Sequence, residues 1–177
     1  MSSSNRKSSR RGFSLLEVTI GTLMTAMLSV MVAGVAVDIS RHTARNILET
    51  QIASEARLAI ENFRRDFSGS CPDVVTGDQA QWRLVGRMIP SDQELRLCFD
   101  ADRDASADWI SPDRVVAYTL NGRELVRTDQ LTGTTFTVAR HVDGIKFKKG
   151  GSKLKVEIDF DLAGVVRSYT FEAADPE

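Results

Sequence analysis

The sequence predicts an α+β protein in which a long N-terminal helix packs on an antiparallel β-sheet. Three observations support this fold class. An apolar run over residues 13–37 carries a single formal charge, which suits a membrane helix. A helical pattern of apolar residues then continues, with no proline before Pro72. Beyond Pro72 the apolar residues alternate with polar ones, as in strands that have one buried face.

The chain begins with a basic segment that differs in charge from the rest. The formal net charge of the 177 residues is −1, yet the first twelve contain four cations and no acid. A short basic end of this kind is typical of a targeting sequence. The predicted segments are a basic leader (1–12), a transmembrane helix (13–37), an amphipathic continuation of that helix (38–70) and a β-rich globular domain (71–177).

Residues 13–37 are long enough to cross a membrane. As a helix they would extend about 37 Å, against a hydrocarbon core of about 30 Å. The apolar run is too long for the h-region of a cleaved secretory signal. The remaining residues are too few to surround such a helix in a protein core. The basic flank precedes the run and Asp38 follows it. The charge asymmetry therefore predicts residues 1–12 in the cytoplasm and 38–177 outside it.

Glu17 is the one formal charge in the apolar run. A carboxylate at the membrane centre costs about 2.5–3.5 kcal/mol, and less near the interface. Two interpretations follow. Glu17 lies shallow and reaches the lipid headgroups, or it pairs with a positive charge from another chain.

The stretch "RRGFSLLEVTI" resembles the cleavage site of type IV prepilins and pseudopilins. It combines a basic leader, Gly12, Phe13, a glutamate as fifth residue after the cut, and a long apolar run. The resemblance covers roughly the first 30 residues. It implies a type IV pilin-like fold, cleavage after Gly12 by a prepilin peptidase and methylation of the new amine of Phe13. It also implies that Glu17 pairs with the N-terminal amine of a neighbouring subunit.

The same resemblance implies where the protein acts and with what. The expected site is the bacterial inner membrane, with a single pass, a cytoplasmic N-terminus and a periplasmic or extracellular domain, and then a pilus or secretion pseudopilus. The expected partners are the peptidase, membrane lipid, an inner-membrane assembly platform, and other pilins or pseudopilins in a hetero-oligomeric filament.

The second half of the predicted helix is amphipathic. One continuous helix is expected from about residue 13 to residue 67. Its apolar positions follow helical spacing and mark the face expected to pack on the sheet: Ile52, Ala56, Ala59, Ile60, Phe63 and Phe67. The opposite face is charged: Glu55, Arg57, Glu61, Arg64 and Arg65.

Seven strands are predicted after the helix, in one antiparallel sheet with one buried side. Asn121-Gly122 is a strong signal for a hairpin turn. The order of these elements resembles the W-type minor pilins and J-type minor pseudopilins, although less specifically than the N-terminal motif. The predicted strands are 94–99, 115–120, 124–127, 135–140, 144–149, 153–160 and 165–171.

The two cysteines, Cys71 and Cys98, are predicted to form a disulfide. The domain is expected outside the cytoplasm, where oxidation is permitted. The bridge would stabilise the fold by roughly 3–4 kcal/mol and tie the helix end to the sheet. Two free buried thiols are the alternative.

An acidic stretch, "DADRDASAD", offers hard oxygen ligands at every second position, which suits calcium. Ala105 stands where a calcium loop has glycine, and Ser111 stands where an EF-hand loop has its bidentate glutamate. The alternative is a solvated acidic turn that Arg103 partly neutralises. The candidate ligands are Asp100, Asp102, Asp104, Ser106 and Asp108.

The sequence does not support an enzyme. Its two histidines, His42 and His141, are far apart, and the motifs GxSxG, HExxH and the phosphate loop are absent. Nucleic acid is not a predicted partner, because the lysines near Gly150 also suit protection of a sheet edge. The alternative function is a signal-anchored extracytoplasmic binding module that does not polymerise.

Overall fold

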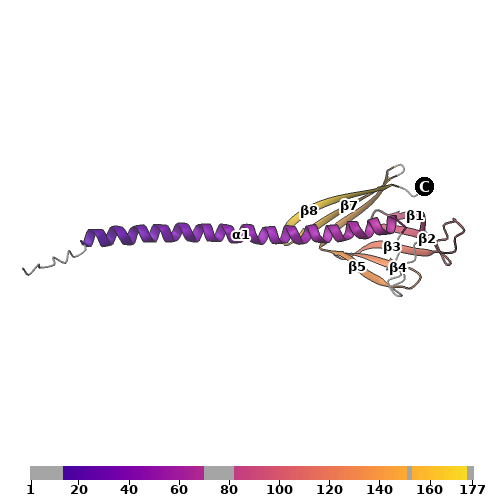
Figure 1. Cartoon of the computed structure of the whole chain (residues 1–177), viewed down its shortest axis with the longest axis horizontal. Helices are drawn as coiled ribbons and strands as arrows, with labels where there is room; N and C mark the ends of the chain where they lie inside the picture. The colour runs from indigo at the N-terminus through magenta and orange to yellow at the C-terminus, as the bar shows by residue number, and fades with distance from the viewer. Residues whose placement is uncertain (1–13, 70–81, 151–152, 175–177) are drawn as a thin grey trace, which may run out of the picture. The chain divides into compact units, whose positions relative to one another are not determined.

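A computed structural model describes residues 14–69, 82–150 and 153–174 of the chain (Figure 1). The described residues form one helix, α1 (Leu15–Phe67), followed by eight strands. The chain divides into two compact units, Met1–Ala44 and Arg45–Glu177. The strands are β1 (Arg83–Ser91), β2 (Glu94–Asp100), β3 (Arg114–Asn121), β4 (Glu124–Asp129), β5 (Thr135–Arg140), β6 (Val142–Gly150), β7 (Lys153–Leu162) and β8 (Val165–Ala174).

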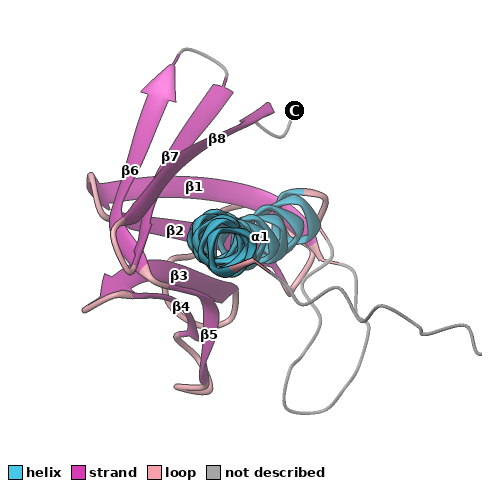
Figure 2. Ribbon diagram, turned by 90° about the vertical axis from the view of Figure 1, so that its left-hand side faces the viewer, coloured by secondary structure: helices cyan, strands magenta, loops and turns pink. Residues whose placement is uncertain are grey.

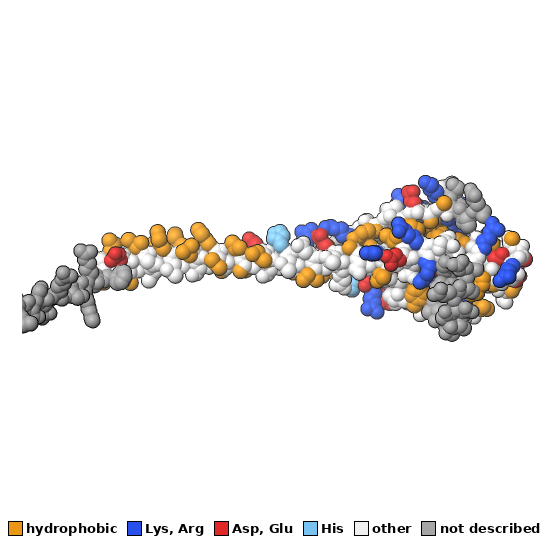
Figure 3. Space-filling view, in the orientation of Figure 1, with side chains coloured by type: hydrophobic (Ala, Val, Ile, Leu, Met, Phe, Trp, Pro, Cys, Tyr) orange, Lys and Arg blue, Asp and Glu red, His pale blue; other side chains and the backbone are white. Residues whose placement is uncertain are grey.

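The described part of the first unit is the N-terminal part of α1. The helix is long and apolar enough to cross a membrane, with a mean hydropathy of 2.1 over its most apolar 18-residue window. Apolar side chains follow this part of the helix in Figure 3. The hydroxyls of Thr25 and Ser29 each donate to a carbonyl four residues earlier, at 2.8 Å. Such back-bonding satisfies a hydroxyl inside an apolar segment.

From Arg45 onward, α1 buries the face that the helical spacing predicts. Ile52, Ala56, Ala59 and Phe63 are each at most 1% exposed. The Phe63 ring lies against Tyr118 of β3, with ring centroids 4.6 Å apart, and 6.2 Å from Phe147 of β6. This half of the helix therefore contacts two groups of antiparallel strands, one that includes β3 and one that includes β6, as the view along the helix axis shows (Figure 2).

The strands form two sheets, so the prediction of a single sheet is wrong. One sheet has the order β1-β2-β3-β4-β5 and the other β6-β7-β8, and every pairing is antiparallel. The chain leaves the first sheet at His141, which lies between β5 and β6 with φ of 60°. A non-glycine residue in this left-handed conformation turns the chain sharply. The period of two in the sequence shows which side of each strand is buried, but not which strands pair.

Strand β1 was not predicted from the sequence. Its residues, "RLVGRMIPS", contain Gly86 and Pro90 and lack the alternation of a half-buried strand. β1 is an edge strand whose pairing with β2 is irregular after Leu84. Edge strands tolerate proline and irregularity because one side of the backbone needs no ladder partner.

The seven predicted strands are confirmed and correspond to β2–β8. Gly122, with φ of 61°, occupies the predicted hairpin turn between β3 and β4. Alternate residues of β7 are fully buried: Leu154, Val156, Ile158 and Phe160.

A buried polar cluster joins the C-terminal end of α1 to the first sheet. The Asp66 carboxylate accepts a hydrogen bond from the Tyr118 hydroxyl and another from Arg127 Nε, both at 2.6 Å. All three side chains are at most 1% exposed. The partners in this cluster fix the register of the helix end against β3 and β4, because a buried charge is costly unless it is paired.

Candidate functional site

The predicted cleavage site, Gly12 and Phe13, lies outside the described residues, and Glu17 lies in the first turn of α1. The backbone N–H of Ser14 donates to Glu17 Oε2 at 3.2 Å, and the N–H of Leu16 donates to Ser14 Oγ at 3.3 Å. The Glu17 contact is one half of an S-x-x-E capping box, and the Ser14 hydroxyl caps the N–H of the second helical residue in place of the third. The S-x-x-E signal is present in the sequence, but this cap was not predicted from it.

The capping box gives Glu17 a role within its own chain. The negative carboxylate lies beside the unpaired N–H groups at the helix start, where the helix dipole favours an anion. Glu17 is exposed and a carboxylate accepts several hydrogen bonds, so this contact leaves it able to accept another donor. The arrangement therefore suits both a capped single helix and a helix whose carboxylate meets a neighbouring cation.

The predicted calcium ligands lie at the end of β2, where Asp100 is the last residue, and in the loop 101–113 that follows. The buried carboxylate of Asp113 accepts the backbone N–H groups of Ala101 and Asp108, both at 2.9 Å. Asp100, also buried, accepts the N–H groups of Arg103 at 2.6 Å and of Ala105 at 3.2 Å. Two buried aspartates at the ends of the loop therefore fold it around themselves.

The predicted ligands do not meet at one point. Carboxylate oxygens of Asp100, Asp102 and Asp113 lie within 4.8 Å of one another, and so do those of Asp102, Asp104 and Asp108. Ser106 belongs to neither group, and Asp113 was not among the predicted ligands. Two groups of three carboxylates that share Asp102 could offer oxygens to a divalent cation, and a solvated acidic turn is equally compatible with the geometry.

The aspartates make the electrostatic potential of this loop negative. Local desolvation, and then the carboxylates of Asp104, Asp113 and Asp100, raise the pKa of the Asp102 carboxyl above its ordinary value, although the backbone N–H of Asp104 acts in the opposite sense. Because these carboxylates lie close together, their mutual repulsion favours protonation of one of them or the approach of a cation.

Cys98 is a free, buried thiol in the structure, so the predicted disulfide is not seen among the described residues. Its expected partner, Cys71, lies outside them. The Cys98 thiol lies 3.4 Å from both Asp113 Oδ2 and the carbonyl oxygen of Asp108. Burial, and then the hydrogen bond to Asp113, raise the pKa of this thiol to about 12. Oxidation proceeds through the thiolate, which these surroundings disfavour.

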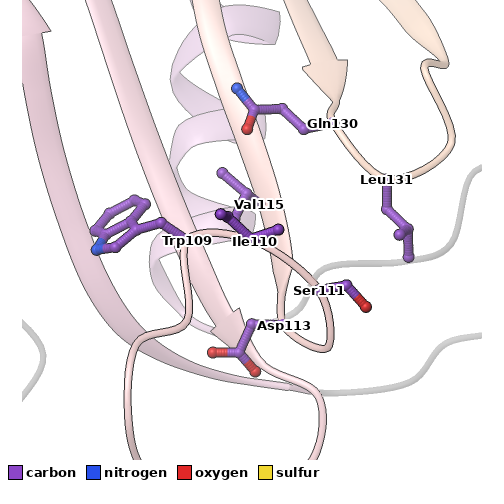
Figure 4. A pocket seen from close by; sticks show the side chains of 7 residues that line it. All are labelled: Trp109, Ile110, Ser111, Asp113, Val115, Gln130 and Leu131. Atoms are coloured by element: carbon purple, nitrogen blue, oxygen red, sulfur yellow. The ribbon is translucent and has the colours of Figure 1, made fainter.

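A pocket of about 340 Å³ lies beside the acidic loop (Figure 4). Trp109, Ile110 and Ser111 come from the loop before β3, and Leu131 comes from the turn after β4. Four of the seven lining residues are apolar, and the other three are polar: Ser111, Asp113 and Gln130. This pocket could not be predicted from the sequence, because its walls come from segments that are separate along the chain.

No protein-family model, curated protein or solved structure matches the chain.

Proposed function

We propose that this protein is a minor pilin or pseudopilin, a structural subunit of a type IV pilus or a type II secretion pseudopilus. The observation that carries the proposal is the placement of Glu17. It is the one formal charge in the apolar run, and it lies in the first turn of a membrane-length helix, five positions after the Gly12 cleavage residue.

In this proposal a prepilin peptidase removes residues 1–12 and exposes the amine of Phe13. The helix then enters a filament, and Glu17 of one subunit accepts the positive amine of its neighbour. Two opposite charges in lipid cost less together than apart, so the carboxylate favours the assembled subunit and sets its register. Before assembly, the contact with the Ser14 N–H lowers the free-energy cost of holding the Glu17 carboxylate in the membrane.

Glu17→Val tests this role in the native cells. Replacement of the carboxylate should leave the helix in the membrane, because the change makes the segment more apolar. It should sharply reduce the amount of the subunit that co-purifies and crosslinks with other prepilin-type subunits. Thr25→Val is the matched control, because its hydroxyl bonds within its own helix, and it should assemble normally. Normal incorporation of Glu17→Val would contradict the assembly role.

A second candidate function is a signal-anchored binding module that never polymerises. The capping box favours it, because Glu17 has a partner within its own chain and needs no other chain. The N-terminal sequence of protein from native membranes separates the two functions. A mature chain that starts at Phe13 supports the filament subunit, whereas an intact leader on all molecules supports the anchored module.

A further inference from the structure

The pocket beside the acidic loop has an unusually exposed apolar rim. Among the large apolar side chains of residues 82–150 and 153–174, Ile110 and Leu131 are the most exposed, at 81% and 61%. Both line the same pocket, although they are 21 positions apart in the sequence. Exposed apolar side chains that gather around a hollow commonly mark a binding surface.

Polar contacts of two buried aspartates, Asp113 and Asp129, hold the backbone of this rim in place. Asp113 anchors the loop that carries Ile110, through the backbone N–H of Asp108. Asp129 anchors the turn that carries Leu131, because its Oδ1 accepts the Leu131 N–H at 3.0 Å. Asp129 also forms a buried ion pair with Arg114, the residue after Asp113. The backbone that carries the two apolar side chains is thus held in place, and a partner need not order it at its own cost.

The margin of the pocket is strongly negative. Residues 100–113 contain five aspartates and one arginine, a net charge of −4. Within the part of the chain that the structure describes, none of these aspartates forms an ion pair. This surface would repel nucleic acid, an anionic membrane or the same surface of a second copy.

We propose that this surface, defined by Ile110, Leu131 and the acidic loop 100–113, docks a segment of another protein that carries an apolar side chain flanked by Lys or Arg. The apolar side chain enters the pocket between Trp109 and Leu131, and the flanking cations lie over the aspartates. Apolar burial supplies the anchor, and the charges select the partner and speed its approach. The inference uses only the second unit and does not depend on filament assembly.

Binding of designed peptides to the full chain in non-ionic detergent tests the proposal. The probe is a fluorescent peptide with a central Leu that has two Lys on each side. One comparison peptide has Ser in place of the Leu, and another has Glu in place of every Lys. Fluorescence anisotropy should show binding of the probe that weakens with added salt, and affinity lower by about tenfold or more for each comparison peptide.

Variants of the rim locate the binding site. Ile110→Ser and Leu131→Ser should each weaken probe binding by about fivefold or more. Val166→Ser is the matched control, because Val166 is 57% exposed and lies on β8, and it should leave binding unchanged. All three are surface changes, and circular dichroism confirms that each variant is folded.

Three results would overturn the proposal. The first is no binding of the probe up to about 1 mM. The second is equal affinity for the Lys and Glu peptides. The third is unchanged binding by both rim variants.

Discussion

At the scale of single residues, Asp66 links the end of the helix to the first sheet. Its carboxylate is fully buried and accepts hydrogen bonds from both Tyr118 and Arg127. Asp66→Ala would leave the buried Arg127 guanidinium without this carboxylate, which should lower the free energy of unfolding by about 3–5 kcal/mol. Tyr118→Phe removes one hydrogen bond and should cost about 1–3 kcal/mol. Denaturant unfolding of the full chain in detergent, followed by tryptophan fluorescence, measures both changes.

An exposed ion pair on the same helix provides the control for Asp66. Arg57 pairs with Glu61 at 2.9 Å, and both side chains are more than half exposed. Arg57→Ala should therefore change stability by less than about 0.5 kcal/mol. A loss for Asp66→Ala as small as the loss for Arg57→Ala would show that the buried cluster does not hold the helix end.

Glu157 is the residue whose titration the structure predicts most directly. Hydrogen bonds from Lys148 and then Lys155 lower the pKa of its carboxyl from 4.5 to about 2. Because the pKa is lowered by folding, the stability from these contacts is fully present above pH 4.5. It is lost as the pH falls toward 2.

An NMR titration of the Glu157 carboxyl tests this prediction. The wild-type chain should give a midpoint well below the ordinary value, and the double variant Lys148→Met, Lys155→Met should return it toward 4.5. An ordinary midpoint in the wild-type chain would show that the two lysines do not hold the carboxylate in solution.

At the scale of elements, Gly86 determines how β1 packs against the acidic loop. A Cβ built at this position would lie 2.8 Å from the Cβ of Ala107 and 3.1 Å from the ring of Trp109. Gly86→Ala should therefore displace the loop and cost about 1–3 kcal/mol, as overpacking does. The unfolding midpoint of the full chain in detergent measures this loss, and Trp109 fluorescence in a Trp82→Phe background reports the displacement.

Gly144 of β6 gives a matched control for Gly86, since a Cβ there meets one side-chain oxygen at 3.6 Å, an ordinary contact. Gly144→Ala should change stability by less than about 1 kcal/mol. If Gly86→Ala were as mild as Gly144→Ala, β1 and the loop would not be in close contact in solution.

The elements also show what could be predicted from the sequence. The helix end at Phe67 and its buried face follow from apolar spacing, which is a local pattern. β1 has no such pattern, because an edge strand around Gly86 and Pro90 needs neither alternation nor a full set of backbone bonds. The cap formed by Ser14 and Glu17 is a local pattern, S-x-x-E, that the sequence contains.

At the scale of the whole molecule, the sequence predicted the α+β class but not the division into two sheets. The chain passes from one sheet to the other at His141, whose left-handed conformation is uncommon for a residue other than glycine, although histidine adopts it more often than most. The pocket was unpredictable for a related reason. Asp113 and Asp129 hold the segments that carry Ile110 and Leu131, and the buried Arg114–Asp129 ion pair joins those segments, which no spacing in the sequence connects.

The orientation of the whole chain in the membrane is the last prediction. Four cations precede the apolar run, whereas Arg41 and Arg45 are the cations that follow it closely. The excess of Lys and Arg should keep the N-terminus in the cytoplasm and place the β-rich unit outside.

Single-cysteine variants test this orientation. Ser3→Cys and Ser40→Cys are each introduced into a chain with Cys71 and Cys98 changed to Ser, in cells without a prepilin peptidase. A membrane-impermeant maleimide should label Ser40→Cys in cells with an intact inner membrane, and Ser3→Cys only after that membrane is disrupted. Labelling of Ser3→Cys in intact cells would contradict the predicted orientation, because it would place the N-terminus outside the cytoplasm.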